Sequence, residues 1–142
     1  MALTEGDKVA VIKLWGKISG QTEAIGSEAL QRLITCFPQC KTYFKHYDLS
    51  PGSAQIRTQG TRILDAIGEA TKHLDNLSES LSKLSDLHAY SLRVDPENFK
   101  LLSHCILVVL AIHCPAEFNS ETHASWDKFL AVISAILTSK YR

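Results

Sequence analysis

Apolar residues recur at spacings of three and four along most of the chain, which is the pattern of amphipathic helices. A first helix is predicted over residues 4–18, because Thr4 and Asp7 match a capping box ahead of the apolar positions. The stripe expected to be buried on this helix is Val9, Ile12, Trp15 and Ile18. A second helix is predicted over residues 22–36, where Pro38 limits it, and its expected apolar side carries Ile25, Ala29, Leu33 and Phe37.

The helical pattern continues after an irregular, aromatic-rich region at residues 39–52. Helices are predicted over residues 53–73 and 80–89, and another begins where Asp95, Pro96 and Glu97 supply a capping residue, a first-turn proline and an acidic group. Residues 101–112 are nearly all apolar, so we expect that helix to be central and buried on most sides until Pro115 ends it. A last helix begins near Asn119. About seven helices and almost no strand-type alternation predict an all-α fold, formed as a single domain by residues 1–142.

Two polar side chains interrupt the apolar faces of the middle helices. Gln59 lies three residues after Ile56 and four before Ile63, and His88 lies four residues after Leu84. A buried amide that finds no hydrogen bond costs roughly 1–3 kcal/mol, so an inward position needs a reason. Either both are core residues that pair with neighbouring polar groups, or both point into one cavity that holds a non-protein group.

The surroundings of His88 limit what such a group can be. Zinc is disfavoured because no second His or Cys stands at ligand spacing from His88. A single inward histidine among apolar side chains suits haem, a large apolar macrocycle whose iron takes one imidazole. The alternative is a helical interaction module without haem, in which protein side chains fill the same space.

The composition narrows the class of protein further. Lys and Arg together number 15, as do Asp and Glu, and this zero net charge argues against nucleic acid or an anionic membrane as the main partner. The longest uninterrupted apolar run, residues 105–112, is far shorter than the roughly 18 residues of a membrane span, and the first residues lack a signal-peptide pattern. We therefore expect a cytoplasmic protein that does not span a membrane.

Cysteine and glycine positions give two further expectations. The four cysteines lack CxxC spacing and are predicted to be free thiols: Cys36, Cys40, Cys105 and Cys114. We place Cys105 in the core and Cys40 at the surface, where a thiol redox function would need it. Gly26 and Gly60 each cost about 1 kcal/mol in a helix interior relative to alanine, which points to a close helix crossing unless both are simply tolerated.

The whole chain is similar to the vertebrate globins, and among them to the alpha-type haemoglobin chains. The stretches that carry the resemblance include KTYF at 41–44, LSDLHA at 84–89, NFKLLSHC at 98–105, DKFL at 127–130 and KYR at 140–142. The resemblance implies the globin fold and a haem b group whose iron is held by His88 on the proximal side. It places Gln59 on the distal side, beside bound dioxygen. Phe44 would stack on the porphyrin and His46 would reach a propionate. The other pocket residues that it implies are Ile63, Leu84, Leu87, Leu92, Val94, Asn98, Phe99, Leu102 and Leu137.

Three positions depart from the usual pattern of these chains. Gln59 stands where most members have His, Ile63 where Val is usual, and Lys45 where Pro is usual. An amide still offers an NH₂ donor to dioxygen, but it cannot shuttle a proton by becoming charged. The added methyl group of Ile63 narrows the distal space.

The function that the resemblance implies is reversible dioxygen transport in red blood cells, by a non-enzymatic subunit of a tetramer with two beta-type chains. Its lasting contact with one beta-type chain would use Arg32, Cys105, Val108, Pro115, Phe118 and His123. A haem enzyme, such as a peroxidase or a nitrite reductase, is the alternative. Peroxide cleavage generally uses a distal acid–base group, whereas Gln59 is a poor base and Arg62 is expected at the surface.

Overall fold

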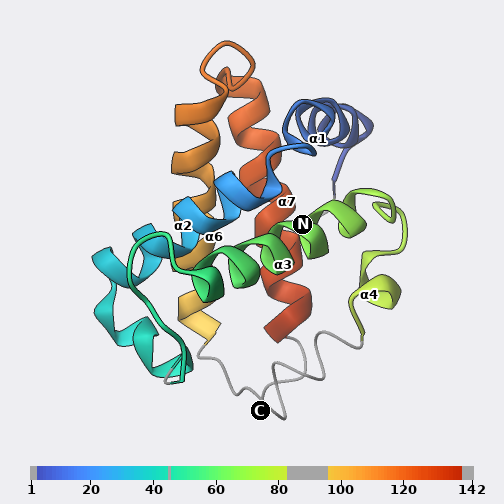
Figure 1. Cartoon of the computed structure of the whole chain (residues 1–142). Helices are drawn as coiled ribbons and strands as arrows, with labels where there is room; N and C mark the ends of the chain where they lie inside the picture. The colour runs from blue at the N-terminus through green and yellow to red at the C-terminus, as the bar shows by residue number, and fades with distance from the viewer. Residues whose placement is uncertain (1–2, 45, 83–95, 139–142) are drawn as a thin grey trace.

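The computed structural model describes residues 3–44, 46–82 and 96–138, and within these ranges the chain forms helices joined by turns, without a strand. The elements in chain order are α1 (Glu5–Ile18), α2 (Thr22–Cys36), the 3₁₀ helix η1 (Pro38–Phe44), α3 (Ala54–Thr71), α4 (Leu77–Ser80), α6 (Pro96–His113) and α7 (Ser120–Thr138) (Figure 1). These described elements confirm the all-α prediction and the expected number of helices. The short α4 was not predicted, and most of the helix expected at 80–89 lies outside the described residues.

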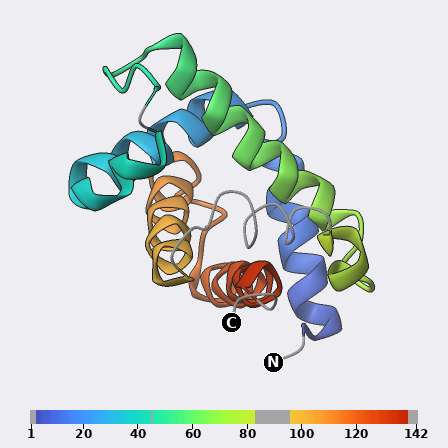
Figure 2. The ribbon, with the colours of Figure 1, turned by 90° about the horizontal axis from the view of Figure 1, so that it is seen from below.

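The helices pack in a few main pairs. α2 packs on both α3 and α6, α1 packs on α7, and α6 and α7 pack on each other. Seen from below, α3 lies across from the pair formed by α6 and α7 (Figure 2). The N-terminal part of α6 and the C-terminal part of α7 lie at the same end of the molecule (Figure 1).

Helix α1 begins as predicted, but it buries a different face. The Thr4 hydroxyl accepts a hydrogen bond from the Asp7 amide at 3.1 Å, and the Asp7 carboxylate accepts one from the Thr4 amide at 2.9 Å. The expected stripe is wrong at Val9 and Ile12, which are 64% and 53% exposed, and right at Ile18, which is buried, and at Trp15, which packs against the core. The buried residues of α1 are Val11, Leu14 and Ile18. Positions spaced only by three drift around a helix of 3.6 residues per turn, whereas alternating spacings of three and four keep one face.

The crossing of α2 and α3 is close because two glycines meet there. A Cβ atom built on Gly26 would lie 2.1 Å from the carbonyl oxygen of Gly60, and one built on Gly60 would lie 2.4 Å from the carbonyl carbon of Gly26. The predicted close crossing is therefore confirmed. It fixes the position of α3, which carries Gln59, relative to α2.

The core consists of two clusters that meet between α3 and α6. The larger draws its buried residues mainly from α1, α3, α6 and α7, with Trp126 and Phe129 at its centre. The smaller, from α2, η1, α3 and α6, contains Leu30, Ile56 and Cys105. The expected burial of α6 holds for Ile106, Val109 and Leu110 but not for its C-terminal end, where Ile112 is 52% exposed.

Cysteine positions agree with the predictions except at one residue. The four thiols are free, and Cys105 is in the core as expected. The prediction that Cys40 lies at the surface is wrong, since it is 0% exposed. The 3₁₀ helix η1 turns this side chain inward against the smaller cluster, and Cys36 is the exposed thiol of the four.

No helix in the described ranges combines the length and the apolar character needed to cross a membrane.

Candidate functional site

Apart from His46, which follows η1, the predicted pocket residues within the described ranges lie on four helical elements. They are Phe44 on η1, Gln59 and Ile63 on α3, Asn98, Phe99 and Leu102 on α6, and Leu137 on α7. The parts of α6 and α7 that carry these residues lie at the same end of the molecule. Helix α3 lies across from these two helices (Figures 1 and 2). Segments far apart in the sequence therefore carry the described part of the predicted site.

The apolar members of this set lie where the two core clusters meet. Ile63 and Leu102 are half-buried, and each packs against both clusters. Phe99 and Leu137 belong to the larger cluster, and Phe44 packs against the smaller one. Ile63 on α3 and Leu102 on α6 therefore connect the cluster that contains Phe99 and Leu137 to the cluster on which Phe44 packs.

Gln59 has a hydrogen-bond partner at one end of its amide. The Tyr47 hydroxyl donates to Gln59 Oε1 at 3.3 Å, and both side chains are partly buried. The Tyr47 amide donates to the Phe44 carbonyl at 3.0 Å, and the two rings lie 5.5 Å apart at an interplanar angle of 59°. Gln59 Nε2 donates to no residue in the part of the chain that the structure describes. Within the described residues, the amide is thus paired through Oε1 alone.

Tyr47 is the site residue that the sequence did not single out. It stands in the aromatic-rich segment, but no periodicity links that segment to α3. Its contact with Gln59 depends on the path of the turn between η1 and α3, so a pattern of hydrophobic spacing cannot reveal it.

A second hydrogen bond joins η1 to α6 at the edge of this region. Asn98 Nδ2 donates to the Tyr43 hydroxyl at 2.7 Å, and both side chains are partly buried. The predicted site residue Asn98 is therefore committed to a neighbouring side chain. This bond and the one at Gln59 attach Tyr43 to α6 and Tyr47 to α3.

Part of the predicted site lies outside the described residues. The predicted iron ligand His88 is among these, together with Leu84, Leu87, Leu92 and Val94, and so is the substituted position Lys45. His46 is described and exposed, beside the half-buried Tyr47. Its expected contact with a propionate stays a prediction.

Burial controls the chemistry of the thiols near the site. It raises the pKa of Cys105 to about 11 and also raises the pKa of Cys40. Both thiols are therefore protonated at neutral pH, and a protonated thiol is a poor nucleophile and a poor metal ligand. Burial and the raised pKa together disfavour the thiol redox function considered for Cys40.

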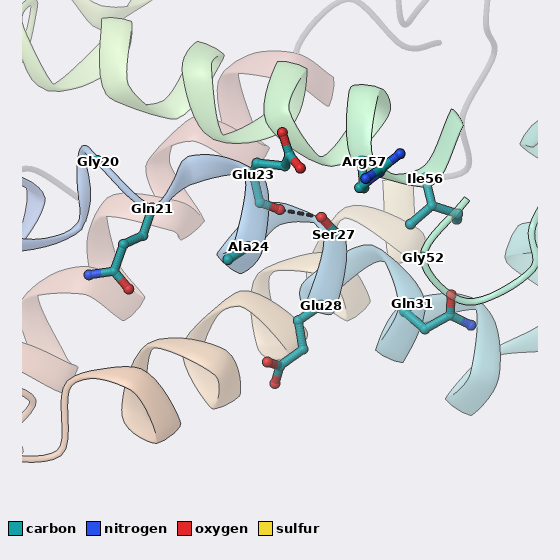
Figure 3. Close-up of a pocket in the computed structure, with 10 residues that line it drawn as sticks. All are labelled: Gly20, Gln21, Glu23, Ala24, Ser27, Glu28, Gln31, Gly52, Ile56 and Arg57. Carbon is teal, nitrogen blue, oxygen red and sulfur yellow. Dashed lines mark hydrogen bonds between the residues drawn. The ribbon is translucent and has the colours of Figure 1, made fainter. Parts of the chain in front are cut away.

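A depression on the described surface is a separate feature. It has a volume of about 610 Å³ and lies between the start of α2 and the start of α3 (Figure 3). Its lining includes Glu23, Glu28, Gln31 and Arg57 and none of the predicted pocket residues. Figure 3 shows the Ser27 hydroxyl bonded to the Glu23 carbonyl within this lining. This depression is therefore distinct from the region around Gln59.

Comparison with known proteins identifies the family. Residues 27–137 match the sequence model of the Globin family. The chain belongs to the globin family. Over its full length this globin is 61% identical to haemoglobin subunit alpha-3 of Xenopus laevis, 60% to haemoglobin larval subunit alpha of Pleurodeles waltl and 56% to haemoglobin subunit zeta of Capra hircus. Each of these relatives is also covered over its full length, which places this globin among the vertebrate alpha-type chains.

The described half of the site in this globin fits a haem group. A flat apolar macrocycle needs apolar walls, which Phe44, Ile63, Phe99, Leu102 and Leu137 supply. The one polar side chain of α3 in this region, Gln59, keeps an amide donor free of the described residues while its oxygen is bonded. The alternative considered from the sequence was a core glutamine whose amide is fully paired with neighbouring polar groups. Within the described residues, Oε1 has such a partner and Nε2 has none.

Proposed function

We propose that this globin binds dioxygen reversibly at the ferrous iron of haem b, as the alpha-type subunit of a red-cell tetramer with two beta-type chains. The observation that carries this proposal is the full-length identity of 56–61% to haemoglobin alpha-type and zeta subunits. The grouping of apolar side chains with one amide donor on α3 supports it independently, because it matches what the walls of a haem site require.

The proposed roles follow from the chemistry of each side chain. Haem b, when bound, supplies the ferrous iron at which dioxygen binds. His88 would hold the iron through one imidazole nitrogen, with its other ring nitrogen oriented by neighbouring backbone or hydroxyl groups. The apolar side chains of α3, α6 and α7 exclude water from the site. The residues proposed to complete these walls from the undescribed segment are Leu84, Leu87, Leu92 and Val94.

Gln59 would act as a hydrogen-bond donor and not as a proton carrier. Its amide has no titratable proton near neutral pH, so it can stabilise partial negative charge on dioxygen without releasing a proton to it. Arg62 is exposed on the outer side of α3, as expected, and does not supply a second distal polar group. Peroxide cleavage generally relies on a distal acid–base group. The described distal side therefore favours a carrier over a haem enzyme.

The proposed contact with a beta-type chain lies around the turn between α6 and α7. Pro115 and His123 are exposed there, and Phe118 stacks on the His123 ring with centroids 5.0 Å apart. Arg32 on α2 pairs with Glu28 at 3.1 Å, and Glu28 also contacts His113 at 2.9 Å. These side chains form an ordered polar and aromatic surface on α2, α6 and the α6–α7 turn, which is suitable for a partner subunit.

An equilibrium dioxygen titration of the purified chain, alone and after mixing with a beta-type chain, tests the proposal. We expect a Soret band in the purified protein, reversible spectral change with dioxygen, and a sigmoidal curve once the beta-type chain is present. A chain that takes up no haem, or that binds dioxygen with the same hyperbolic curve and no change in mass after mixing, would reject the proposal.

A further inference from the structure

Helix α1 lies at the edge of the molecule, and its outer side carries two large apolar side chains that the proposed function does not use (Figure 1). Val9 and Ile12 are 64% and 53% exposed, and among the described residues the other large apolar side chain with such exposure is Ile112, at 52%. Ile112 lies one helical turn after Val108, in the proposed contact with a beta-type chain, so a partner subunit accounts for it. Val9 and Ile12 belong to a different helix, and that contact does not include them.

These two side chains are the middle of a stripe that runs along the outer side of α1. Its members are spaced by four, three and four residues, which keeps them on one face of a helix. The α1 stripe consists of Glu5, Val9, Ile12 and Gly16, and all four residues are exposed. A Cβ atom built on Gly16 would meet nothing within 4 Å, so the surface is open at this end of the stripe. Another helix can therefore lie closely along it.

The two ends of the α1 stripe carry opposite charges. At the N-terminal end, the Glu5 side chain is 90% exposed, although it pairs with Lys8 at 3.3 Å. At the other end, Lys13 and Lys17 lie on either side of Gly16 in the sequence and are exposed. Neither of these two lysines forms an ion pair with a residue in the described ranges. Because acid and base are separated along its length, the stripe is complementary to a second copy that runs in the opposite direction.

We propose that the α1 stripe is a docking surface for a second copy of this chain, with the two α1 helices antiparallel. Placing Val9 of one copy against Ile12 of the other covers the exposed apolar side chains of both copies. In the same register Glu5 of one copy lies over Gly16 of the other, since Glu5 precedes Val9 by four residues and Gly16 follows Ile12 by four. The missing side chain of Gly16 leaves space for the Glu5 carboxylate beside Lys13 and Lys17. Two-fold symmetry repeats each of these contacts.

The size of the α1 stripe sets the strength of this contact. One face of a 14-residue helix buries less area than the roughly 1,200–2,000 Å² of a stable protein–protein interface. The zero net charge of the chain leaves little long-range repulsion to oppose association. We therefore expect weak and reversible pairing, with a dissociation constant of about 0.1–1 mM at low salt. The inference goes beyond the proposed function, because the contact needs neither haem nor a beta-type chain.

Sedimentation equilibrium of the purified chain from about 20 μM to about 1 mM tests the pairing. We expect the weight-average mass to rise with concentration, and the association constant to fall about fivefold or more when Val9→Thr and Ile12→Gln are combined. Raising the salt concentration should weaken the wild-type association, because the ion pairs at both ends are exposed. This salt series needs no variant, and an association that strengthens with salt would overturn the proposed register.

A charge exchange tests whether the α1 stripe itself makes the contact. Glu5→Lys places three amino groups together in the paired state, and Lys13→Glu combined with Lys17→Glu places three carboxylates together. Each of these variants alone should associate about threefold or more weakly than the wild type. An equimolar mixture of the two restores opposite charges at both ends, so it should associate more tightly than either variant alone. Ile112→Gln, placed in both variants, is the matched control and should leave the gain on mixing unchanged.

Three results would overturn the second copy as the occupant of the α1 stripe. The first is a mass that stays at that of a single chain up to about 1 mM. The second is a mixture that associates no more tightly than the separate charge variants. The third is a chain that stays single but binds phosphatidylserine vesicles through Val9 and Ile12, which would assign the stripe to a lipid surface. A chain without haem would fail the proposed function and leave these measurements unaffected.

Discussion

Gly26 and Gly60 face each other where α2 crosses α3, and the Cβ position of Gly26 lies 2.1 Å from the Gly60 carbonyl oxygen. No side chain can relieve a contact with backbone atoms at that distance, so a methyl group here must push the two helices apart. Because α3 carries Gln59 and Ile63, this crossing also sets the distance between the distal side chains and the rest of the site.

Adding a methyl group at this crossing should lower the stability of the folded protein. We predict that Gly60→Ala lowers the free energy of unfolding by about 3 kcal/mol or more, which exceeds the gain of about 1 kcal/mol in helix propensity. Urea unfolding followed by circular dichroism measures the change. Gly16→Ala is the matched control, since a Cβ at Gly16 in α1 meets nothing within 4 Å. It should be neutral or slightly stabilising, and equal effects of the two substitutions would contradict the crossing.

Asp7 links the start of α1 to α7, and its lowered pKa leads us to expect that stability depends on pH. Its carboxylate accepts hydrogen bonds from Lys128 at 2.6 Å and from Ser125 at 2.9 Å, and Lys128 is the main reason that the pKa of Asp7 lies well below its ordinary value of 3.8. A carboxyl whose pKa is lower in the folded state stabilises the protein above its unfolded pKa, and this contribution is lost as the pH falls toward the folded pKa.

The difference in unfolding free energy between the wild type and Asp7→Asn should therefore be constant from pH 7 to about pH 5 and shrink below about pH 4. Denaturant unfolding at a series of pH values measures it. Glu5→Gln is the control, because Glu5 pairs with Lys8 at the surface, where such pairs contribute little. A wild-type advantage that grows as the pH falls would show that the Asp7 contacts have been misassigned.

Thiol reactivity should separate one cysteine from the other three. Cys36 is exposed, whereas burial raises the pKa of Cys40, Cys105 and Cys114. We predict that an aromatic disulfide reagent at pH 8 modifies Cys36 rapidly and the others only after denaturant is added. Mass spectrometry of the modified peptides identifies the sites, with Cys36→Ser as the control. Modification of Cys105 as fast as Cys36 in the native protein would contradict its position in the core.

Ile63→Val tests whether Ile63 lines the ligand space as well as the core. Ile63 packs against both core clusters, so removing one methyl group should cost about 0.5–1.5 kcal/mol of stability. The smaller side chain should also let dioxygen enter faster, measured by flash photolysis of the assembled protein. Ile67→Val is a comparison on the same helix, since Ile67 packs in the larger cluster alone. An equal rate change in both variants would argue against a specific role for Ile63.

Local signals in the sequence were enough to predict where most helices begin and end. The capping residue Thr4 and the proline at 38 act on the backbone next to them, so they can be recognised without the fold. The pair Gly26 and Gly60 was also predictable, because glycine in a helix interior is costly and needs a compensating contact.

Features that depend on tertiary packing could not be predicted in the same way. Val9 and Ile12 are apolar yet exposed, because the face of α1 that packs on α7 is set by Val11 and Leu14. Cys40 is buried because η1 turns it inward, and Tyr47 reaches Gln59 because of the path of an irregular turn. In the candidate site, the apolar members were foreseeable from the resemblance to globins, whereas the partner of Gln59 required the structure.

In the proposed site, His88 holds the iron of a haem group and Gln59 faces the other side of that group. The most direct test is the visible spectrum and haem content of His88→Gly after gel filtration, with and without free imidazole. We predict that the variant loses haem or shows a shifted Soret band, and that added imidazole restores the wild-type spectrum. A His88→Gly protein that retains haem as tightly as the wild type, with an unaltered spectrum and no response to imidazole, would contradict the account.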